Sequence, residues 1–223
     1  MDRGLIGQAV SKFIIGFAVT GILIFLPAGT FDYWNAWLLL GVLFIPMLLA
    51  GIVMILRNPE LLRKRLKMKE EETEQKNVIK ISICMFALGF VTAGCNYRFG
   101  WILIPEWISW AAAGIFLLAY LLYVEVMREN MYLSRAVEIQ EDQKVIDTGL
   151  YGIVRHPMYS VTIILFLSMP LILGSVISFV IFLIYPVVLV KRIENEEKVL
   201  REGLEGYETY QKKVRYRMIP FIW

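Results

Sequence analysis

Two polar motifs in the C-terminal third of the chain contain residue types that can do chemistry. The first covers residues 149–159, reads GLYGIVRHPMY, and contains the only histidine, His156. The second covers residues 192–197 and reads RIENEE. An imidazole, tyrosine rings and a pair of carboxylates suit a cationic ligand that also carries hydroxyl groups and a base. We therefore expect the chemistry of this protein where the two motifs meet.

Pro157 sets the local structure of the first motif. The residue before a proline is biased away from the helical region, whereas proline itself is well placed in a first helical turn. His156 is therefore predicted at a helix N-terminus, where backbone N–H groups favour a carboxylate or a phosphate. The alternative is that Arg155 and His156 only anchor the chain at a membrane interface, with Tyr151 and Tyr159 in an aromatic belt.

The second motif weakens that alternative. Arg192 and Glu196 are four residues apart and would share one face of a helix, so an ion pair between them would be unremarkable. Such a pair does not explain Glu197, nor why acidic groups lie beside a membrane surface that prefers Lys and Arg.

Composition places the chain among integral membrane proteins. Of its 223 residues, 58% are hydrophobic, and the mean hydropathy is +0.60. The apolar residues occur in runs long enough to span a bilayer, and no shift in composition separates a soluble domain. We predict a single all-α domain over residues 1–223, with the cofactor-binding and catalytic region at about 130–223. The formal charge of +3 is small, so nucleic-acid binding is not expected.

The two cysteines and the single histidine exclude other kinds of site. Cys84 and Cys95 fall in one apolar segment, and on a helix they would be about 16 Å apart, which is too far for a disulfide. With no cluster of Cys and His, a structural zinc site is also excluded, and no metal is expected.

Five apolar stretches predict a polytopic bundle of transmembrane helices. They cover residues 7–26, 34–56, 78–97, 102–127 and 158–190. The last is too long for one crossing, and Gly174-Ser175 is its only turn-like break. We predict a hairpin of two short helices, 158–173 and 176–191, which gives five to six spans in all. The alternative is one steeply tilted helix.

The distribution of basic residues predicts the orientation. Lys and Arg crowd the loop after the second helix and the segment after residue 190, whereas 27–33 has neither. By the positive-inside rule, both termini, the helical C-terminal tail and the site are expected on the cytoplasmic side. This orientation requires an even number of crossings between 158 and 190.

The ordered set of motifs resembles a known family. GLY at 149–151, RHPMY at 155–159, EEKVL at 196–200 and GYETY at 206–210 are similar to the C-terminal signature of the isoprenylcysteine carboxyl methyltransferase family. Asn130 and the stretch 137–140 extend the resemblance upstream. Departures are Leu150, where proline is frequent, and Ser160-Val161 after the tyrosine; these bear on the acceptor more than on the cofactor.

The resemblance implies S-adenosylmethionine as cofactor and a lipophilic acceptor, possibly the carboxylate of a prenylated cysteine, arriving from the membrane lipids. The chain agrees with such a site in having no G-x-G pair, so the usual nucleotide fingerprint is absent. Carried over by position, the implied roles divide into two groups. Cofactor contacts fall on Tyr151, His156, Pro157, Tyr159, Glu196 and Glu197. Arg155 and Arg192 would orient an anionic acceptor, and Glu196 or His156 could serve as base for an amine or thiol.

Two other functions fit parts of the pattern. A membrane sterol or enone reductase that uses NADPH also has an Arg-His-Pro-x-Tyr element, but the pair Glu196-Glu197 and Met158 argue against it. A scaffold without activity could keep the fold, but the intact His156, Tyr159 and glutamate pair favour an enzyme. The identity of the acceptor stays open at this point.

Overall fold

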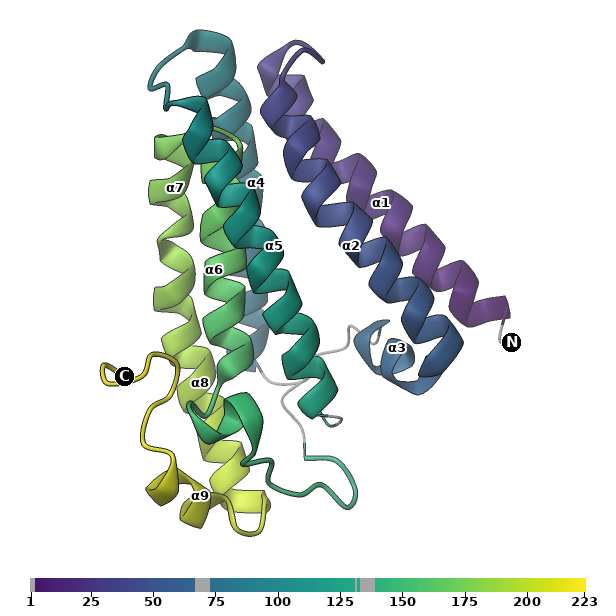
Figure 1. Cartoon of the computed structure of the whole chain (residues 1–223), viewed down its shortest axis with the longest axis vertical. Coiled ribbons are helices and arrows are strands. Elements are labelled where there is room, and N and C mark those ends of the chain that lie inside the picture. The colour runs from purple at the N-terminus through teal and green to yellow at the C-terminus, as the bar shows by residue number, and fades with distance from the viewer. Residues whose placement is uncertain (1–2, 67–72, 131, 133–138) are drawn as a thin grey trace.

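The predicted all-helical membrane bundle is confirmed. The computed structural model describes residues 3–66, 73–130, 132 and 139–223, and these contain helices and no strands (Figure 1). The helices are α1 (Arg3–Ala28), α2 (Trp34–Arg57), α3 (Pro59–Leu66), α4 (Thr73–Phe99), α5 (Glu106–Glu129), the 3-10 turn η1 (Gly149–Gly152), α6 (Pro157–Ile172), α7 (Val176–Phe182), α8 (Ile184–Gly203) and α9 (Tyr207–Lys213). Within the described residues, five helical stretches are long and apolar enough to cross a membrane, counting α7 and α8 together as Val176–Gly203, while α6 is shorter.

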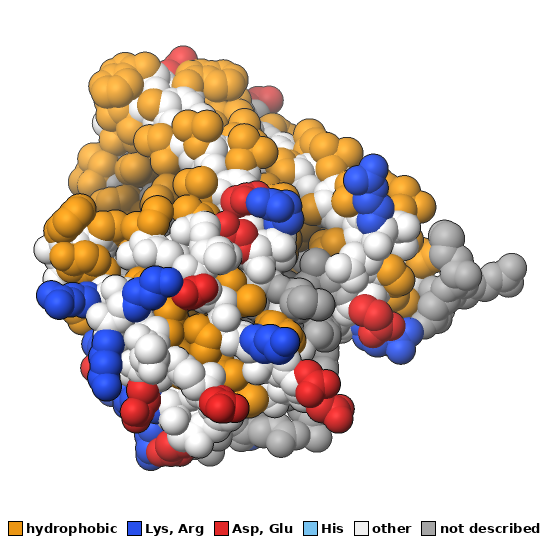
Figure 2. Space-filling model, turned by 60° about the horizontal axis from the view of Figure 1, so that its bottom comes forward, with side chains coloured by type: hydrophobic (Ala, Val, Ile, Leu, Met, Phe, Trp, Pro, Cys, Tyr) orange, Lys and Arg blue, Asp and Glu red, His pale blue; other side chains and the backbone are white. Residues whose placement is uncertain are grey.

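Successive long helices run in opposite directions, so the connections alternate between two ends of the bundle (Figure 1). Both termini, α3, the end of α5 and α9 lie at the same end. Figure 2 shows Lys, Arg, Asp and Glu side chains gathered there, with hydrophobic side chains over the adjoining flank. This alternation agrees with the predicted even number of crossings between residues 158 and 190. That the charged end faces the cytoplasm stays a prediction, which a reporter fused after Trp223 would test.

The apolar stretch after Pro157 folds as the predicted hairpin rather than as one tilted helix. The chain reverses between α6 and α7, where Gly174 has φ +73°, a value that glycine adopts without a steric penalty. Ser175 then caps α7, since its hydroxyl accepts a hydrogen bond of 3.2 Å from the backbone N–H of Ser178. The break signal read at Gly174-Ser175 is therefore the turn itself.

The tip of the hairpin is buried within the bundle. The last carbonyls of a helix lack partners inside the helix and must find them elsewhere. Here they accept hydrogen bonds from side chains of other segments. The pairs are Ser109 Oγ to Leu171 O at 3.1 Å, Asn35 Nδ2 to Ile172 O at 2.9 Å, and the Tyr33 hydroxyl to Leu173 O. Because these groups are satisfied by protein, the 16-residue α6 can end inside the bundle.

The second arm of the hairpin is longer than predicted and is interrupted. It continues to Gly203 instead of ending at 191, with a break at Leu183 between α7 and α8. Pro186, which has no N–H to donate to the carbonyl four residues earlier, lies in the first turn of α8 and accounts for the break. As a result, Glu196 and Glu197 are carried on a helix that continues out of the apolar region.

Helix α5 begins at Glu106 rather than at 102, and Asn96 explains the difference. Its Oδ1 accepts a hydrogen bond of 3.1 Å from Ile102 N, and its Nδ2 donates one of 3.0 Å to Ile102 O. A side chain that pairs with both polar groups of one residue holds it outside a helix. Pro105 then occupies the N-cap position.

Helices α1 and α4 approach closely at Gly94. A Cβ atom at this position would overlap the Ile24 carbonyl oxygen and lie 3.0 Å from Ala28 N, both backbone atoms of α1. Backbone cannot swing aside as a side chain can. We expect Gly94→Ala to separate the two helices and destabilise the protein by about 1–3 kcal/mol. The thermal unfolding midpoint in detergent would measure the effect.

Gly114→Ala in α5 is the matched control. An added Cβ there meets nothing within 4 Å. Because alanine is the better helix former, this variant is expected to unfold at the wild-type midpoint or above it. Equal midpoints for the two variants would contradict the close crossing at Gly94.

Candidate functional site

The first motif adopts the predicted local structure. His156 is the N-cap residue of α6, with φ −125° and ψ 59°, and Pro157 is the first helical residue. The backbone N–H groups of Arg155 and His156 do not face a ligand, because they donate to Tyr216 O at 2.9 Å and Arg217 O at 2.8 Å. The segment after α9 therefore runs alongside the motif and fixes it.

Glu197 is the centre of a buried ionic cluster. Its side chain is 1% exposed, and Arg155 Nε lies 2.7 Å from Oε1 and Arg217 Nε 3.1 Å from Oε2. His156 Nε2 lies 3.2 Å from the same Oε1. Arg155 also donates to the carbonyls of Val214 and Arg215 at 2.8 and 2.7 Å. These contacts join α6, α8 and the tail, so Glu197 positions the site rather than facing its pocket.

Glu196 belongs to a second set of contacts. The Tyr159 hydroxyl donates to Glu196 Oε2 at 2.7 Å and accepts from Arg192 Nε at 2.8 Å. His156 Nδ1 lies 4.0 Å from the same Oε2. The side chain of Glu196 is 26% exposed, against 1% for Glu197. The two neighbouring glutamates therefore have different environments, and only Glu196 is open to a ligand.

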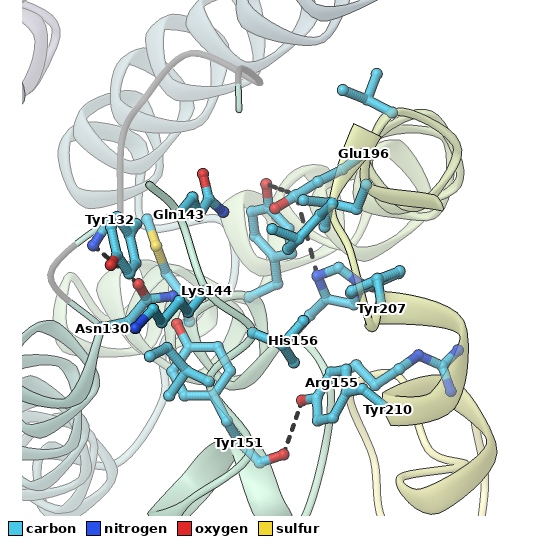
Figure 3. A pocket seen from close by; sticks show the side chains of 17 residues that line it. Asn130, Tyr132, Gln143, Lys144, Tyr151, Arg155, His156, Glu196, Tyr207 and Tyr210 are labelled. Carbon is cyan, nitrogen blue, oxygen red and sulfur yellow. Dashed lines mark hydrogen bonds and ion pairs between the residues drawn. The ribbon is translucent and has the colours of Figure 1, made fainter. Parts of the chain in front are cut away.

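A pocket opens beside these residues (Figure 3). Its empty volume is about 870 Å³ with the open mouth included, within the range of small-molecule sites. Five of the predicted site residues line it: Tyr151, Arg155, His156, Tyr159 and Glu196. Pro157, Arg192 and Glu197 do not line it, and they support residues that do. The structure thus brings the two motifs together at one end of the hairpin, as predicted.

The pocket also includes residues that sequence reasoning did not assign. They lie on the segment before the first motif and on α9: Asn130, Tyr132, Gln143, Lys144, Tyr207 and Tyr210. Asn130, Tyr207 and Tyr210 belong to stretches that carried the family resemblance, which was the signal that could have found them. Gln143 and Lys144 carried no such signal. Val137 and Glu138, also part of the resemblance, lie outside the described residues.

The 3-10 turn that holds Tyr151 is fixed from two sides. The Tyr210 hydroxyl donates to Tyr151 O at 2.7 Å, and Glu129 Oε2 accepts from Leu150 N at 3.0 Å. Gly149 has φ +52°, and a Cβ there would overlap the Glu129 carboxylate. The positive φ favours glycine at the start of this turn, which presents Tyr151 to the pocket.

The aromatic and acidic side chains of the pocket suit a ligand that is a cation and carries hydroxyl groups. Tyr151, Tyr159, Tyr207 and Tyr210 supply aromatic rings, and Glu196 supplies a carboxylate. Aromatic faces attract cations, and a carboxylate accepts hydrogen bonds from hydroxyl or amino groups. Burial, followed by the negative charges of Glu197 and Glu196, raises the pKa of Tyr207, so its hydroxyl stays neutral and can donate.

Comparison with known proteins agrees with the motifs. A search of curated proteins found no match to the chain. The model of the isoprenylcysteine carboxyl methyltransferase (ICMT) family matches residues 110–202. The matched range begins in α5, includes both polar motifs and ends before Gly206, so the GYETY stretch at 206–210 lies beyond it. The resemblance to the ICMT family is thereby confirmed over residues 110–202 of this membrane protein.

Proposed function

We propose that this protein is an S-adenosylmethionine-dependent methyltransferase of the membrane, acting on a lipophilic acceptor. The observation that carries the proposal is the pocket at the charged end of the α6–α8 hairpin, which is lined by Tyr151, Tyr159 and Glu196 within the range matched by the ICMT family and by Tyr207 and Tyr210 beyond that range. An NADPH-dependent reductase is less well supported, because the ICMT family model matches residues 110–202, a range that contains both polar motifs.

Different side chains of the site would bind different groups of the cofactor. When bound, S-adenosylmethionine supplies a methyl group on a sulfonium that is already activated for transfer. Glu196 accepts hydrogen bonds from the ligand, and the rings of Tyr151 and Tyr159 lie around the cation. The hydroxyl of Tyr159 fixes the Glu196 carboxylate, and Arg192 fixes that hydroxyl. The protein contributes alignment and exclusion of water.

A carboxylate acceptor, such as that of a prenylated cysteine, needs no general base. Arg192, at the point where α8 leaves the apolar region, is the cation proposed to orient it. The Arg155 guanidinium binds Glu197 and two tail carbonyls, so in this proposal Arg155 supports the site and Arg192 is the cation for the acceptor. For an amine or thiol acceptor, Glu196 would be the base, since it is the more exposed carboxylate.

Isothermal titration of the purified protein tests the cofactor assignment. S-adenosylhomocysteine keeps the hydroxyls, base and amino acid of the cofactor and is not consumed, so it is expected to bind saturably. NADPH, titrated under the same conditions, is expected to show no saturable binding. Saturable binding of NADPH without binding of S-adenosylhomocysteine would assign the site to a reductase.

Varying the length of the acceptor's apolar tail tests whether the acceptor reaches the site from the bilayer. The proposed site lies where the hairpin meets the aqueous phase, so the apolar tail of the acceptor is expected to stay in the bilayer. Each buried CH₂ contributes about 0.8 kcal/mol to partitioning. Methylation of prenylated cysteine analogues should therefore fall steeply as the tail shortens with the head group unchanged. Equal rates for a head group without a tail would contradict entry from the membrane.

A further inference from the structure

Within the described residues, two buried side-chain polar atoms have no hydrogen-bond partner: the amide nitrogen of Asn195 and the hydroxyl of Tyr207. Of these two residues only Tyr207, which is 4% exposed, lines the pocket. A buried hydroxyl without a partner costs free energy, and native proteins satisfy nearly all such groups. Tyr207 therefore lines the pocket and carries a buried hydroxyl that the protein itself leaves unpaired.

The ring of Tyr207 is held in place while its hydroxyl is left unpaired. Tyr207 packs with Tyr210 at a ring-centroid distance of 5.7 Å, in a small cluster with Leu204 and Val214. Gly206, with φ +83°, sets the turn from which α9 begins. The hydroxyl therefore has a fixed position, and a ligand group that binds there gains a donor without having to order a side chain.

The neighbouring charges restrict what that ligand group can be. Glu196 lines the same pocket, and the negative charges of Glu197 and Glu196 each act on the Tyr207 hydroxyl more strongly than the positive charge of Arg155 does. A ligand carboxylate would be repelled there, and an ammonium group has no lone pair to accept a hydrogen bond. A ligand hydroxyl can accept from Tyr207 and donate to Glu196 through the same oxygen.

We propose that Tyr207 donates a hydrogen bond to a ribose hydroxyl of the bound cofactor, and that the same hydroxyl donates to Glu196. This inference rests on the proposed function, because S-adenosylmethionine supplies the ribose. Tyr207 lies outside the range matched by the family model, which ends at residue 202. It extends the binding site from α8 onto α9.

The test compares Tyr207→Phe with Tyr210→Phe, two changes that each remove one hydroxyl. Titration calorimetry with S-adenosylhomocysteine is expected to show about 3- to 10-fold weaker binding for Tyr207→Phe. Its thermal midpoint without ligand should equal or exceed that of wild type, because no protein partner is lost. Tyr210→Phe should lower that midpoint, because Tyr151 O loses its donor. A midpoint lowered as much by Tyr207→Phe would assign a structural role and overturn the proposal.

The 2′-deoxy and 3′-deoxy forms of S-adenosylhomocysteine test whether Tyr207 contacts a ribose hydroxyl, and which of the two it contacts. For one of them the ligand lacks the hydroxyl that Tyr207 contacts, so wild type and Tyr207→Phe should bind it equally. An undiminished difference with both deoxy forms would overturn the ribose contact. Equal binding of the complete ligand by wild type and variant would overturn the role of Tyr207 alone. If wild type binds none of these ligands, the proposed function itself fails, and this inference with it.

Discussion

Glu197→Gln is expected to lower the thermal unfolding midpoint by on the order of 10 °C. Glutamine keeps the shape of the side chain but removes the charge that balances Arg155, whose side chain is 8% exposed. Breaking a buried ion pair from one side costs about 3–5 kcal/mol, and each kcal/mol shifts the midpoint of a protein of this size by about 2–4 °C. Tryptophan fluorescence during heating in detergent would measure the shift.

Glu194→Gln provides the control for this prediction. Glu194 lies on the same helix, is exposed, and carries the same charge. Surface substitutions of this kind change stability by about 0.5 kcal/mol or less, so the midpoint of Glu194→Gln should match that of wild type. A Glu197→Gln midpoint as high as that of this control would mean that the contacts of Glu197 with Arg155, His156 and Arg217 do not hold the site together.

Glu196→Gln is expected to weaken the binding of S-adenosylhomocysteine and to leave the thermal unfolding midpoint nearly unchanged, in contrast to Glu197→Gln. Its carboxylate faces the pocket and is 26% exposed. Loss of a charge-assisted hydrogen bond costs about 1.5–3 kcal/mol, which corresponds to about 10- to 150-fold weaker binding of S-adenosylhomocysteine. The Tyr159 hydroxyl can still donate to the glutamine oxygen, so the fold should be little changed. Titration calorimetry and the thermal midpoint together test both parts.

The comparison between the two variants separates ligand contact from support. If Glu196→Gln bound S-adenosylhomocysteine as tightly as wild type, the carboxylate would not contact the ligand and the orientation of the cofactor in the pocket would have to change. Glu194→Gln again serves as control, since it removes one charge from the same helix without altering the pocket.

The membrane helices could be predicted from sequence because hydropathy and turn signals are local. The runs of apolar residues located the first four long helices and α6 to within a few residues, although the second arm of the hairpin continues to Gly203 rather than ending at 191. Gly174-Ser175 marked the hairpin turn. Two departures arose from contacts that local patterns do not encode. Asn96 binds Ile102 across the turn before α5, and the break at Leu183 depends on where Pro186 falls within a helix.

Part of the candidate site could also be predicted, because some of its signals are local in the sequence. His156 at a helix start follows from Pro157, and the family resemblance identified the polar residues of both motifs. The sequence did not show which of these residues face the pocket and which support them, because this depends on partners far along the chain. Arg217 and the carbonyls of Val214 and Arg215 decide that Glu197 and Arg155 bind each other. No periodicity or motif spacing records a contact between residues 155 and 215.

The pairing of the tail with the first motif also sets an order of assembly during synthesis. Arg155 and Arg215, whose carbonyl oxygen it binds, are 60 residues apart, and a ribosome adds about 5–20 residues per second. The start of the hairpin is therefore synthesised several seconds before Arg155 can acquire its tail partners, which follow shortly after the end of α8 at Gly203. A nascent chain that stopped before Val214 would contain all of its membrane helices and still lack the contacts that fix Arg155 and His156. In this protein the membrane domain can form first, and the pocket is completed last.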